Sequence, residues 1–398
     1  MSSRNIKSRV QRANPAVDLV MRMMAISGKS GEELEIQQFI RSHLLQAGID
    51  ESRITVDSAH TKSRHGGETG NLIVKLPGTV REPRRLLMAH IDTVPICVDS
   101  RPIRRGGFVH SADARTGLGG DNRAGAAVVL NTILEIQRRG LPHPPLTLFW
   151  PVQEEVGLVG ARFVARGKLG RPQLCFNWDG GAPNMAVIGA TGAIYMDIHV
   201  QGIASHAGAH PEDGVSAIAI AGLAIAKLTE AGWHGLIRKG KQSGTSNIGV
   251  ISGGSATNVV VNEVLARVEA RSHNPAFRRR ISEEFRKAFE RAAKKVRNTA
   301  GECGSIRFES EQKYESFRLK KTEPCVREAL SAVAECGCEP QTRIINGGLD
   351  ANWMTAHGFP TVSLGCGQAD IHTINETLHI ESFLQACRIA VRLATVPH

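Results

Sequence analysis

The sequence predicts an α/β protein in which a domain with a mostly parallel sheet is interrupted by a smaller, ferredoxin-like α+β domain. Two observations lead to this fold class. Short apolar strands alternate with helices in the first and last parts of the chain, as they do in parallel sheets. Between these parts, residues 191–315 follow the order β-α-β-β-α-β. The predicted domains are therefore residues 1–190 together with 316–398, and residues 191–315.

Length and composition limit the possible classes of protein. A chain of 398 residues is long for a single core, and its hydrophobic fraction of 41% is ordinary for a globular protein. The net charge of +11 comes from dispersed basic runs without interleaved aromatic residues, so nucleic acid is not an expected partner. No apolar run approaches the roughly 18 residues of a membrane span.

The start of the chain and the cysteines bear on location. The basic residues before Asn14 are not accompanied by an apolar segment, so a secretory signal is not expected. The eight cysteines are scattered and form no Cys-x-x-Cys pair. We therefore expect free thiols and a cytoplasmic location.

The larger domain begins with two stretches, residues 15–26 and 32–47, in which apolar side chains recur at three- and four-residue spacing. This spacing predicts amphipathic helices. Short apolar runs bounded by glycine, proline or polar residues then predict strands. The expected strands are residues 71–76, 86–89, 146–150, 174–178 and 361–364, and the later helices are residues 123–138 and 323–336.

The smaller domain begins near Thr191, where the pattern changes to alternating apolar and polar residues. Such alternation is typical of strands with one buried face. A proline starts the highly charged helix, which we interpret as having a solvated face. The expected strands are residues 193–200, 247–251, 263–271 and 305–310, and the helices are residues 214–228 and 275–297.

Two adjacent carboxylates, Glu154 and Glu155, follow the apolar run 146–150. Neighbouring side chains of an extended or turning backbone point in different directions, so the two groups cannot perform the same task. One division makes one of them a metal ligand and the other a general base for water. The alternative is a solvated turn at the end of a strand.

Other ionisable residues also follow predicted strands. His90 and Asp92 come directly after residues 86–89, and Asp179 comes directly after residues 174–178. Ligands of open α/β sheets bind beyond the carboxyl ends of the strands. A ligating histidine needs an acceptor to fix its tautomer, and Asp92 is placed to provide one.

Glycine-rich turns precede two further candidates. Asp121 lies between Gly119-Gly120 and a predicted helix, where a helix N-cap is an equal alternative to a metal ligand. His372 follows Gly365-Cys366-Gly367 at a short distance. Two histidines with three carboxylates suit zinc or a similar divalent metal. An aspartate between two ions, with one histidine and one further carboxylate for each ion, would form a two-metal hydrolase site.

Five motifs occur along the chain in a characteristic order. They are His90-x-Asp92-Thr93-x-Pro95, Gly120-Asp121-Asn122-x-Ala124-Gly125, Glu154-Glu155-x-Gly157, Asp179-Gly180 and His372-Thr373-x-Asn375-Glu376. Together they resemble the metal site of the co-catalytic zinc metallopeptidase family that includes peptidase T, carboxypeptidase G2 and the aminoacylases. The resemblance covers nearly the whole chain and implies a di-metal amidohydrolase.

The resemblance also implies a role for each residue. His90 and Asp179 correspond to ligands of one metal, Glu155 and His372 to ligands of the other, and Asp121 to the bridging ligand. Asp92 corresponds to the residue that orients His90, and Glu154 to the general base. The peptide bond between Asp121 and Asn122 is typically cis in this family, which is rare outside proline. The implied cofactors are two divalent ions, zinc in the first place, with manganese and cobalt as alternatives.

The inserted domain resembles the lid and dimerisation domain of the same family. His206, within Gly202-Ile203-Ala204-Ser205-His206-Ala207-Gly208, matches a histidine that stabilises the oxyanion, often from the partner subunit. An ordinary surface histidine is the alternative. Asn258 and Arg271 match lid residues that bind the carboxylate or backbone of the substrate, and an arginine fork suits a carboxylate. A homodimer through this domain is expected.

The segment Gly347-Gly348-Leu349-Asp350-Ala351-Asn352 resembles the substrate-side loop of peptidase T-like proteins. Asp350 and Asn352 could contact the amine end of a substrate, although turn chemistry explains them equally well. Tripeptide aminopeptidases tend to carry arginine where this chain has Asn346. We therefore expect an aminopeptidase or dipeptidase for short peptides, without strict tripeptide specificity.

Three alternatives remain. A deacylase of N-acyl amino acids and a carboxypeptidase belong to the same family. A non-catalytic metal-binding or nucleic-acid-binding descendant belongs to another class, and the basic charge is its only support.

Overall fold

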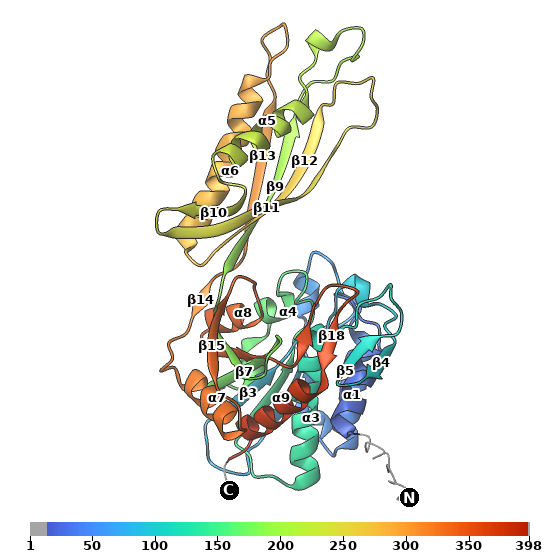
Figure 1. Ribbon diagram of the computed structural model, residues 1–398, viewed down its shortest axis with the longest axis vertical. Coiled ribbons are helices and arrows are strands. Elements are labelled where there is room, and N and C mark those ends of the chain that lie inside the picture. Colours follow the sequence, from blue (N-terminus) through green and yellow to red (C-terminus); the bar gives the residue numbers. More distant parts are fainter. Residues whose placement is uncertain (1–13, 397–398) are drawn as a thin grey trace, which may run out of the picture. The chain divides into compact units, whose positions relative to one another are not determined.

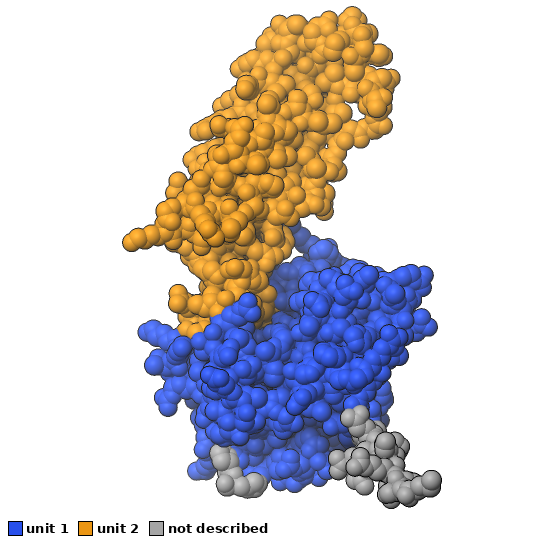
Figure 2. Space-filling view, viewed as in Figure 1, with its two compact units in different colours: residues 1–187, 320–343, 357–398 blue, residues 188–319, 344–356 orange. Residues whose placement is uncertain are grey.

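The computed structural model describes residues 14–396, so the basic stretch at the start of the chain lies outside the described residues. The chain divides into two compact units, which are coloured separately in Figure 2. Unit 1 comprises Met1–Val187, Lys320–Arg343 and His357–His398, and unit 2 comprises Ile188–Leu319 and Ile344–Ala356. These boundaries lie a few residues from the expected ones, and they assign one further segment to unit 2.

The central sheet has nine strands in the order β1-β2-β6-β3-β7-β16-β8-β14, and β15 (Gln341–Ile345) also pairs with β8, while β14 is Phe317–Arg318. Its other strands are β1 (Ile54–Val56), β2 (Leu72–Leu76), β3 (Arg85–Met88), β6 (Leu146–Trp150), β7 (Leu174–Trp178), β8 (Met185–Ala190) and β16 (Thr361–Leu364). The neighbours β6, β3, β7 and β16 run parallel, whereas the outer pairings are antiparallel. The sheet is therefore mixed, with the predicted parallel strands at its centre.

Helices cover this sheet because its central strands are apolar on both faces. Every residue of β3 and β6 is buried, as expected for strands in the middle of an α/β layer. Helix α3 (Gly120–Arg139) packs against α1 (Pro15–Met24) and α9 (Ile380–Ala394) (Figure 1). Helix α7 (Pro324–Glu335) packs against α9, β7 and β16, and α2 (Leu34–Gln46) contacts α3. Among residues 14–396, none of the helices has the length and apolar character that crossing a bilayer requires.

A second, smaller sheet of unit 1 was not predicted. Its order is β17-β18-β5-β4, and all its pairings are antiparallel. The strands are β4 (Pro102–Arg105), β5 (Phe108–Ser111), β17 (Gln368–Ala369) and β18 (Thr377–His379). The loop that joins β17 to β18 carries His372, so this sheet determines where that histidine lies.

Unit 2 has an antiparallel sheet of order β10-β11-β12-β9-β13. Its elements are β9 (Gly192–Gln201), α5 (Ala217–Glu230), β10 (Gly235–Lys239), β11 (Gln242–Gly253), β12 (Glu263–Ser272), α6 (Pro275–Lys295) and β13 (Ser305–Tyr314). Without β10, the order of elements is the predicted β-α-β-β-α-β. The ferredoxin-like arrangement is thus present, with β10 as an additional edge strand.

The core of unit 2 lies between this sheet and its helices. Alternate residues of β9 and β12 are buried, and α5 and α6 pack against each other (Figure 1). Helix α6 buries Phe277, Ile281, Phe285 and Phe289, whose four-residue spacing places them on one face. Asn274 begins this helix because its side chain accepts a hydrogen bond from the Phe277 amide.

The segment Ile344–Ala356, which includes α8 (Ala351–Ala356), belongs to unit 2, whereas the sequence predicts it within the larger domain. Two contacts explain the difference. A Cβ atom on Gly348 would lie 2.3 Å from Tyr314 Cζ, so the chain approaches that ring closely. The side-chain Nδ2 of Asn352 donates hydrogen bonds to the backbone carbonyl oxygens of Thr191 and Glu315.

The aromatic core of α6 leads to a stability prediction. Replacing Phe285 with alanine should lower the free energy of unfolding of unit 2 by about 3–5 kcal/mol, because the removed ring leaves a cavity. The matched control is Arg279→Ala, an exposed residue of the same helix, which should change it by less than about 0.5 kcal/mol. Denaturant unfolding followed by tryptophan fluorescence measures both. Equal effects would contradict the assignment of Phe285 to the core.

Candidate metal centre

The carboxyl ends of β3, β6 and β7 meet at one edge of the central sheet because these strands run parallel. His90 and Asp92 follow β3, Glu154 and Glu155 follow β6, and Asp179 follows β7. His90, Asp92 and Glu154 are buried, with exposed fractions of 8% or less. The structure thus brings these predicted residues to one edge, where Glu155 and Asp179 are partly exposed.

Asp121 lies between two histidines. Its Oδ1 is 3.3 Å from His90 Nε2, and its Oδ2 is 3.3 Å from His372 Nε2. His372 Nε2 also lies 2.9 Å from Glu155 Oε1. Each oxygen of Asp121 therefore faces a different imidazole, which is the arrangement that a shared ligand of two ions requires.

The remaining acidic groups complete this cluster. Ligand atoms of His90, Asp121 and Glu155 all lie within 4.8 Å of one another, and the same holds for His90, Glu154 and Asp179. The two groups overlap at His90. Imidazole nitrogens and carboxylate oxygens at this density are donors that zinc, manganese and cobalt accept. The residues present therefore fit a pair of divalent ions.

The electrostatics of the cluster favour positive charge. Burial, with the neighbouring charge of Asp121, raises the pKa of Asp179 to about 7, and burial also raises the pKa of Glu155. Hydrogen bonds with Asp121 and Glu155 raise the pKa of His372 to about 10. Burial opposes ionisation of Asp121, but its two histidine partners outweigh it and hold the pKa of Asp121 well below its usual range. Without cations, protons must supply the balancing charge.

Asp92 connects His90 to both glutamates. Its Oδ1 lies 3.3 Å from His90 Nδ1 and accepts a hydrogen bond of 2.9 Å from the Glu154 amide. Its Oδ2 accepts hydrogen bonds from the Glu155 amide at 3.1 Å and from Ser30 Oγ at 2.6 Å. Asp92 is fully buried. One carboxylate thus positions the imidazole and fixes the backbone from which the two glutamates diverge.

Asp121 does not serve as a helix cap, which settles the alternative that the sequence left open. Gly119 is the N-cap residue of α3, with φ of 78°, while Asp121 and Asn122 have non-helical angles. The Asn122 side chain, in place of Asp121, accepts a hydrogen bond from the Gly125 amide. The Asp121–Asn122 peptide bond is cis, as the resemblance led us to expect.

Sequence reasoning missed the residues that support the glutamate pair. Gln153, directly before the pair, is buried and has a φ of 55°, in the left-handed region that few non-glycine residues adopt. Its amide donates to Glu33 Oε1, and its side chain bonds Ser63 Oγ and the Gly66 carbonyl oxygen. Glu33 is 120 residues away in the chain. No local pattern marks so distant a partner.

The predicted lid residues lie in unit 2 and are described there alone. His206 is exposed, and its Nδ1 accepts hydrogen bonds from the amides of Gly208 and Ala209. Asn258 is also exposed and lies beside this loop, because its carbonyl oxygen accepts a hydrogen bond from the Ala207 amide. His206 and Asn258 therefore form one surface.

The other predicted substrate contacts of unit 2 are less accessible. Arg271 is half-buried and forms two hydrogen bonds with Glu269, at 3.2 and 3.0 Å. Asp350 and Asn352 are buried. Both donors of the Asn352 amide bond backbone carbonyl oxygens, and its Oδ1 accepts a hydrogen bond from the Leu349 amide. Asn352 consequently holds its own loop in place.

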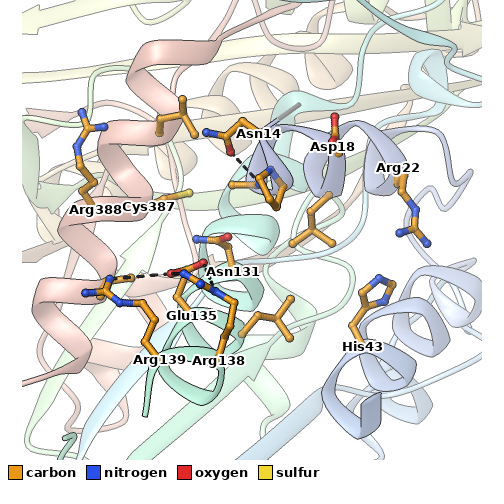
Figure 3. A pocket seen from close by; sticks show the side chains of 16 residues that line it. Asn14, Asp18, Arg22, His43, Asn131, Glu135, Arg138, Arg139, Cys387 and Arg388 are labelled. Carbon is orange, nitrogen blue, oxygen red and sulfur yellow. Dashed lines mark hydrogen bonds and ion pairs between the residues drawn. The ribbon is translucent and has the colours of Figure 1, made fainter. Parts of the chain in front are cut away.

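A cavity of about 1050 Å³ lies elsewhere in unit 1, between α1, α3 and α9 (Figure 3). Its polar lining includes Arg22, Arg388 and the bidentate pair of Arg138 with Glu135. None of the predicted site residues lines it. The cluster of predicted residues at the sheet edge is therefore separate from this cavity.

Two known domain families match the chain. Residues 188–297 match the peptidase dimerisation domain of the M20 group, and residues 71–193 match peptidase family M28. The first match lies within unit 2, and the second covers the segment that contains His90, Asp121, Glu154, Glu155 and Asp179.

Three relatives cover almost all of the chain. A tripeptidase structure from Staphylococcus aureus has a TM-score of 0.84 at 29% identity, covering 95% of this chain and 96% of the relative. The aminopeptidase PepT structure from Bacillus cereus has a TM-score of 0.79 at 30% identity, covering 95% and 97%. The protein YqjE of Bacillus subtilis is 30% identical over 374 residues, covering 94% and 95%.

Glu33 gives a pH-dependent stability prediction. Burial, with the charge of Asp92, raises the pKa of Glu33 to about 8. A carboxyl group whose pKa is higher in the folded state binds its proton more tightly there, so raising the pH from about 5 to 9 weakens folding. The Glu33→Gln variant keeps an oxygen that can accept the hydrogen bond from the Gln153 amide, but it has no carboxyl group to titrate. The Tm of the metal-free wild type should therefore fall relative to this variant by several degrees over that range, since about 1 kcal/mol shifts Tm by 2–4 °C.

Thermal unfolding at a series of pH values measures this difference. The Glu135→Gln variant is a control, because Glu135 lies on the solvated side of α3 in the ion pair with Arg138. A Tm difference between wild type and Glu33→Gln that stays constant with pH would contradict a buried, titrating Glu33.

Proposed function

The chain belongs to the peptidase T-like group of the M20 metallopeptidase family, and on this premise we propose that it releases residues from the amino end of short peptides. It is a metal-dependent peptidase. The observation that carries the proposal is the cluster around Asp121, in which His90 and His372 face opposite oxygens of one carboxylate. The name of one relative, an aminopeptidase, supports the amino-end specificity, and that of another, a tripeptidase, supports short peptides as substrates.

We propose that His90 and Asp179 hold one divalent ion, Glu155 and His372 hold the other, and Asp121 binds both. Bound divalent ions supply Lewis-acid chemistry that polarises a carbonyl group and makes water more acidic. The donor set suits zinc first, with manganese and cobalt as alternatives.

Glu154 is the proposed general base. It is buried, and its amide is fixed by Asp92 Oδ1, so its carboxylate is held at the sheet edge beside His90 and Asp179. In the proposed reaction Glu154 accepts a proton from the attacking water and then delivers it to the leaving amine. Asp92 orients His90 and holds Glu154 and Glu155 apart.

His206 is suited to stabilising the oxyanion. Because its Nδ1 accepts hydrogen bonds from two amides, the neutral ring carries its proton on Nε2. An Nε2–H group on the exposed ring is a donor for the oxygen that gains negative charge.

The substrate contacts proposed for unit 2 are Asn258, Arg271 and Asp350. Asn258 would bind the substrate backbone, and Arg271 would bind a carboxylate in competition with Glu269. Asp350 would face the amine end, while Asn352 holds the loop. Asn346, which bonds His273 at 3.1 Å, stands where tripeptide aminopeptidases tend to have arginine. We therefore propose activity on dipeptides as well as tripeptides.

We propose a homodimer formed through unit 2. The match to a peptidase dimerisation domain supports it, as does the apolar surface of this unit. Its exposed apolar side chains include Ile218, Leu223, Leu236, Val250 and Ile251. A partner subunit could cover apolar side chains exposed in this way. We further propose a cytoplasmic location, which the eight free cysteines support.

One alternative within the family is favoured by a specific residue. Arg271 could bind the free carboxylate of a carboxypeptidase substrate or of an N-acyl amino acid, since its planar fork matches that group. Its pairing with Glu269 would have to open for either kind of substrate, so the peptide panel below decides between them.

The adjacent glutamates should give opposite results when changed one at a time. Glu154→Gln should retain both metal ions and lose about 10²–10⁴-fold in kcat, because only the proton carrier is removed. Glu155→Gln should lose metal, because a ligand is removed. Elemental analysis after dialysis, with kinetics on one dipeptide, measures both effects, and each variant is the control for the other. Undiminished turnover in Glu154→Gln would exclude it as the base.

A peptide panel tests the substrate class. We expect hydrolysis of dipeptides and tripeptides with a free amino end, loss of activity with a chelator, and recovery with zinc or manganese. N-acetylated peptides should be poor substrates. Preferential cleavage of N-acetyl amino acids would favour the deacylase instead. Release from the carboxyl end would favour a carboxypeptidase, and absence of turnover with metal restored would favour a binding protein.

A further inference from the structure

The carboxylate of Glu376 lies in a ring of backbone amides. Its Oε2 accepts hydrogen bonds from the amides of Leu118 at 2.9 Å and Gly119 at 2.7 Å, and its Oε1 accepts one from Asp121 at 2.8 Å. The side chain is 2% exposed. From these contacts we infer that Glu376 is a positioning residue, which fixes the backbone of Asp121 and thereby the shared ligand of the metal centre.

The local sequence is built for this contact. The amides of Leu118 and Gly119 lie just before α3, and Asp121 has non-helical angles in its first turn, so all three need an acceptor outside the helix. A charged acceptor forms shorter and stronger hydrogen bonds than a neutral one. Glycines let the chain close around it, because a Cβ atom on Gly120 would lie 3.1 Å from Glu376 Oε1 and one on Gly117 would lie 3.3 Å from Oε2. The glycines around Leu118 therefore form a cradle for the carboxylate.

The segment between β17 and β18 contacts Asp121 at two points. Glu376 bonds the main chain of Asp121, while His372, four residues earlier, faces its Oδ2. His372 needs such support, since its side chain is 45% exposed and its φ is 63°. His90, by contrast, is 2% exposed and follows a central strand. Loss of the Glu376 anchor should thus affect the His372 side of the centre more than the His90 side.

This role rests on the proposed metal centre, and the test separates the two. In Glu376→Gln an amide nitrogen replaces one oxygen and faces backbone donors, so at least one of the three hydrogen bonds is lost. Metal-free protein is titrated with Co²⁺, followed by calorimetry and by the visible absorption of the bound ion. Wild type should bind two ions. In the variant the first ion should bind nearly normally and the second about 10–100-fold more weakly, with an altered spectrum.

A matched control distinguishes positioning from general stability. Asp57 is also buried and accepts hydrogen bonds from the amides of Ala59, Asn71 and Ala165, but it contacts none of the proposed ligands. Asp57→Asn should lower the Tm while leaving both Co²⁺ affinities and the spectrum unchanged. Glu376→Asp, which keeps the charge on a shorter side chain, should give an intermediate second affinity and provides a readout if Glu376→Gln does not fold.

Each outcome decides between the two hypotheses. Two ions in wild type with a selectively weakened second ion in the Glu376 variants supports the positioning role. Two ions of wild-type affinity and spectrum in both Glu376 variants would overturn that role while leaving the proposed function intact. A wild type that binds no Co²⁺ would overturn the proposed metal centre, and the role of Glu376 with it.

Discussion

The concentration of like charge at one sheet edge is the constraint on which the rest of the structure depends. Asp121, Glu155 and Asp179 are drawn together where burial makes their repulsion strong, as the raised pKa of Asp179 to about 7 indicates. A second set of carboxylates, Asp92 and Glu376, supports these groups. Asp92 and Glu376 accept hydrogen bonds from main-chain amides and are not among the proposed metal ligands. The inner acids are the proposed metal ligands, and the outer acids accept hydrogen bonds from the main chain of the loops that carry these ligands.

The sequence placed Glu155 and Asp179 at this edge because both follow strands with abrupt ends, whereas Asp121 was found from the two glycines before it and the predicted helix after it. Strands β6 and β7 begin and end where the apolar runs do, so the residues after them could be placed at one edge without knowing the structure. The residues that support this inner set, including Ser30 and Glu33, were only partly predictable from the sequence. Asp92 is close to His90 in the chain, but Glu33 and Ser30 reach the site from a connection between two helices. Their hydrogen bonds span many residues, and local patterns carry no information on such contacts.

In the domain organisation, too, features set by local sequence patterns were predicted, and features set by contacts between distant residues were not. Alternating burial in β9 and β12 made the ferredoxin-like insert predictable, whereas β10 was missed because its residues are mostly exposed and do not alternate clearly. The segment 344–356 was assigned by chain order to the larger domain. Its membership of unit 2 depends on a glycine that lets the chain pass close to Tyr314, which only the folded structure reveals.

The separation of Glu154 from Glu155 is the clearest case of a functional difference imposed by the backbone. The two residues are chemically identical and adjacent, so their different proposed roles must come from geometry. Gln153 holds a left-handed φ before them, and the two oxygens of Asp92 bind their successive amides. Asp92 also faces His90 Nδ1. A change at Asp92 would therefore disturb a proposed ligand and the proposed base together, so its effect on activity would not report the loss of histidine orientation alone.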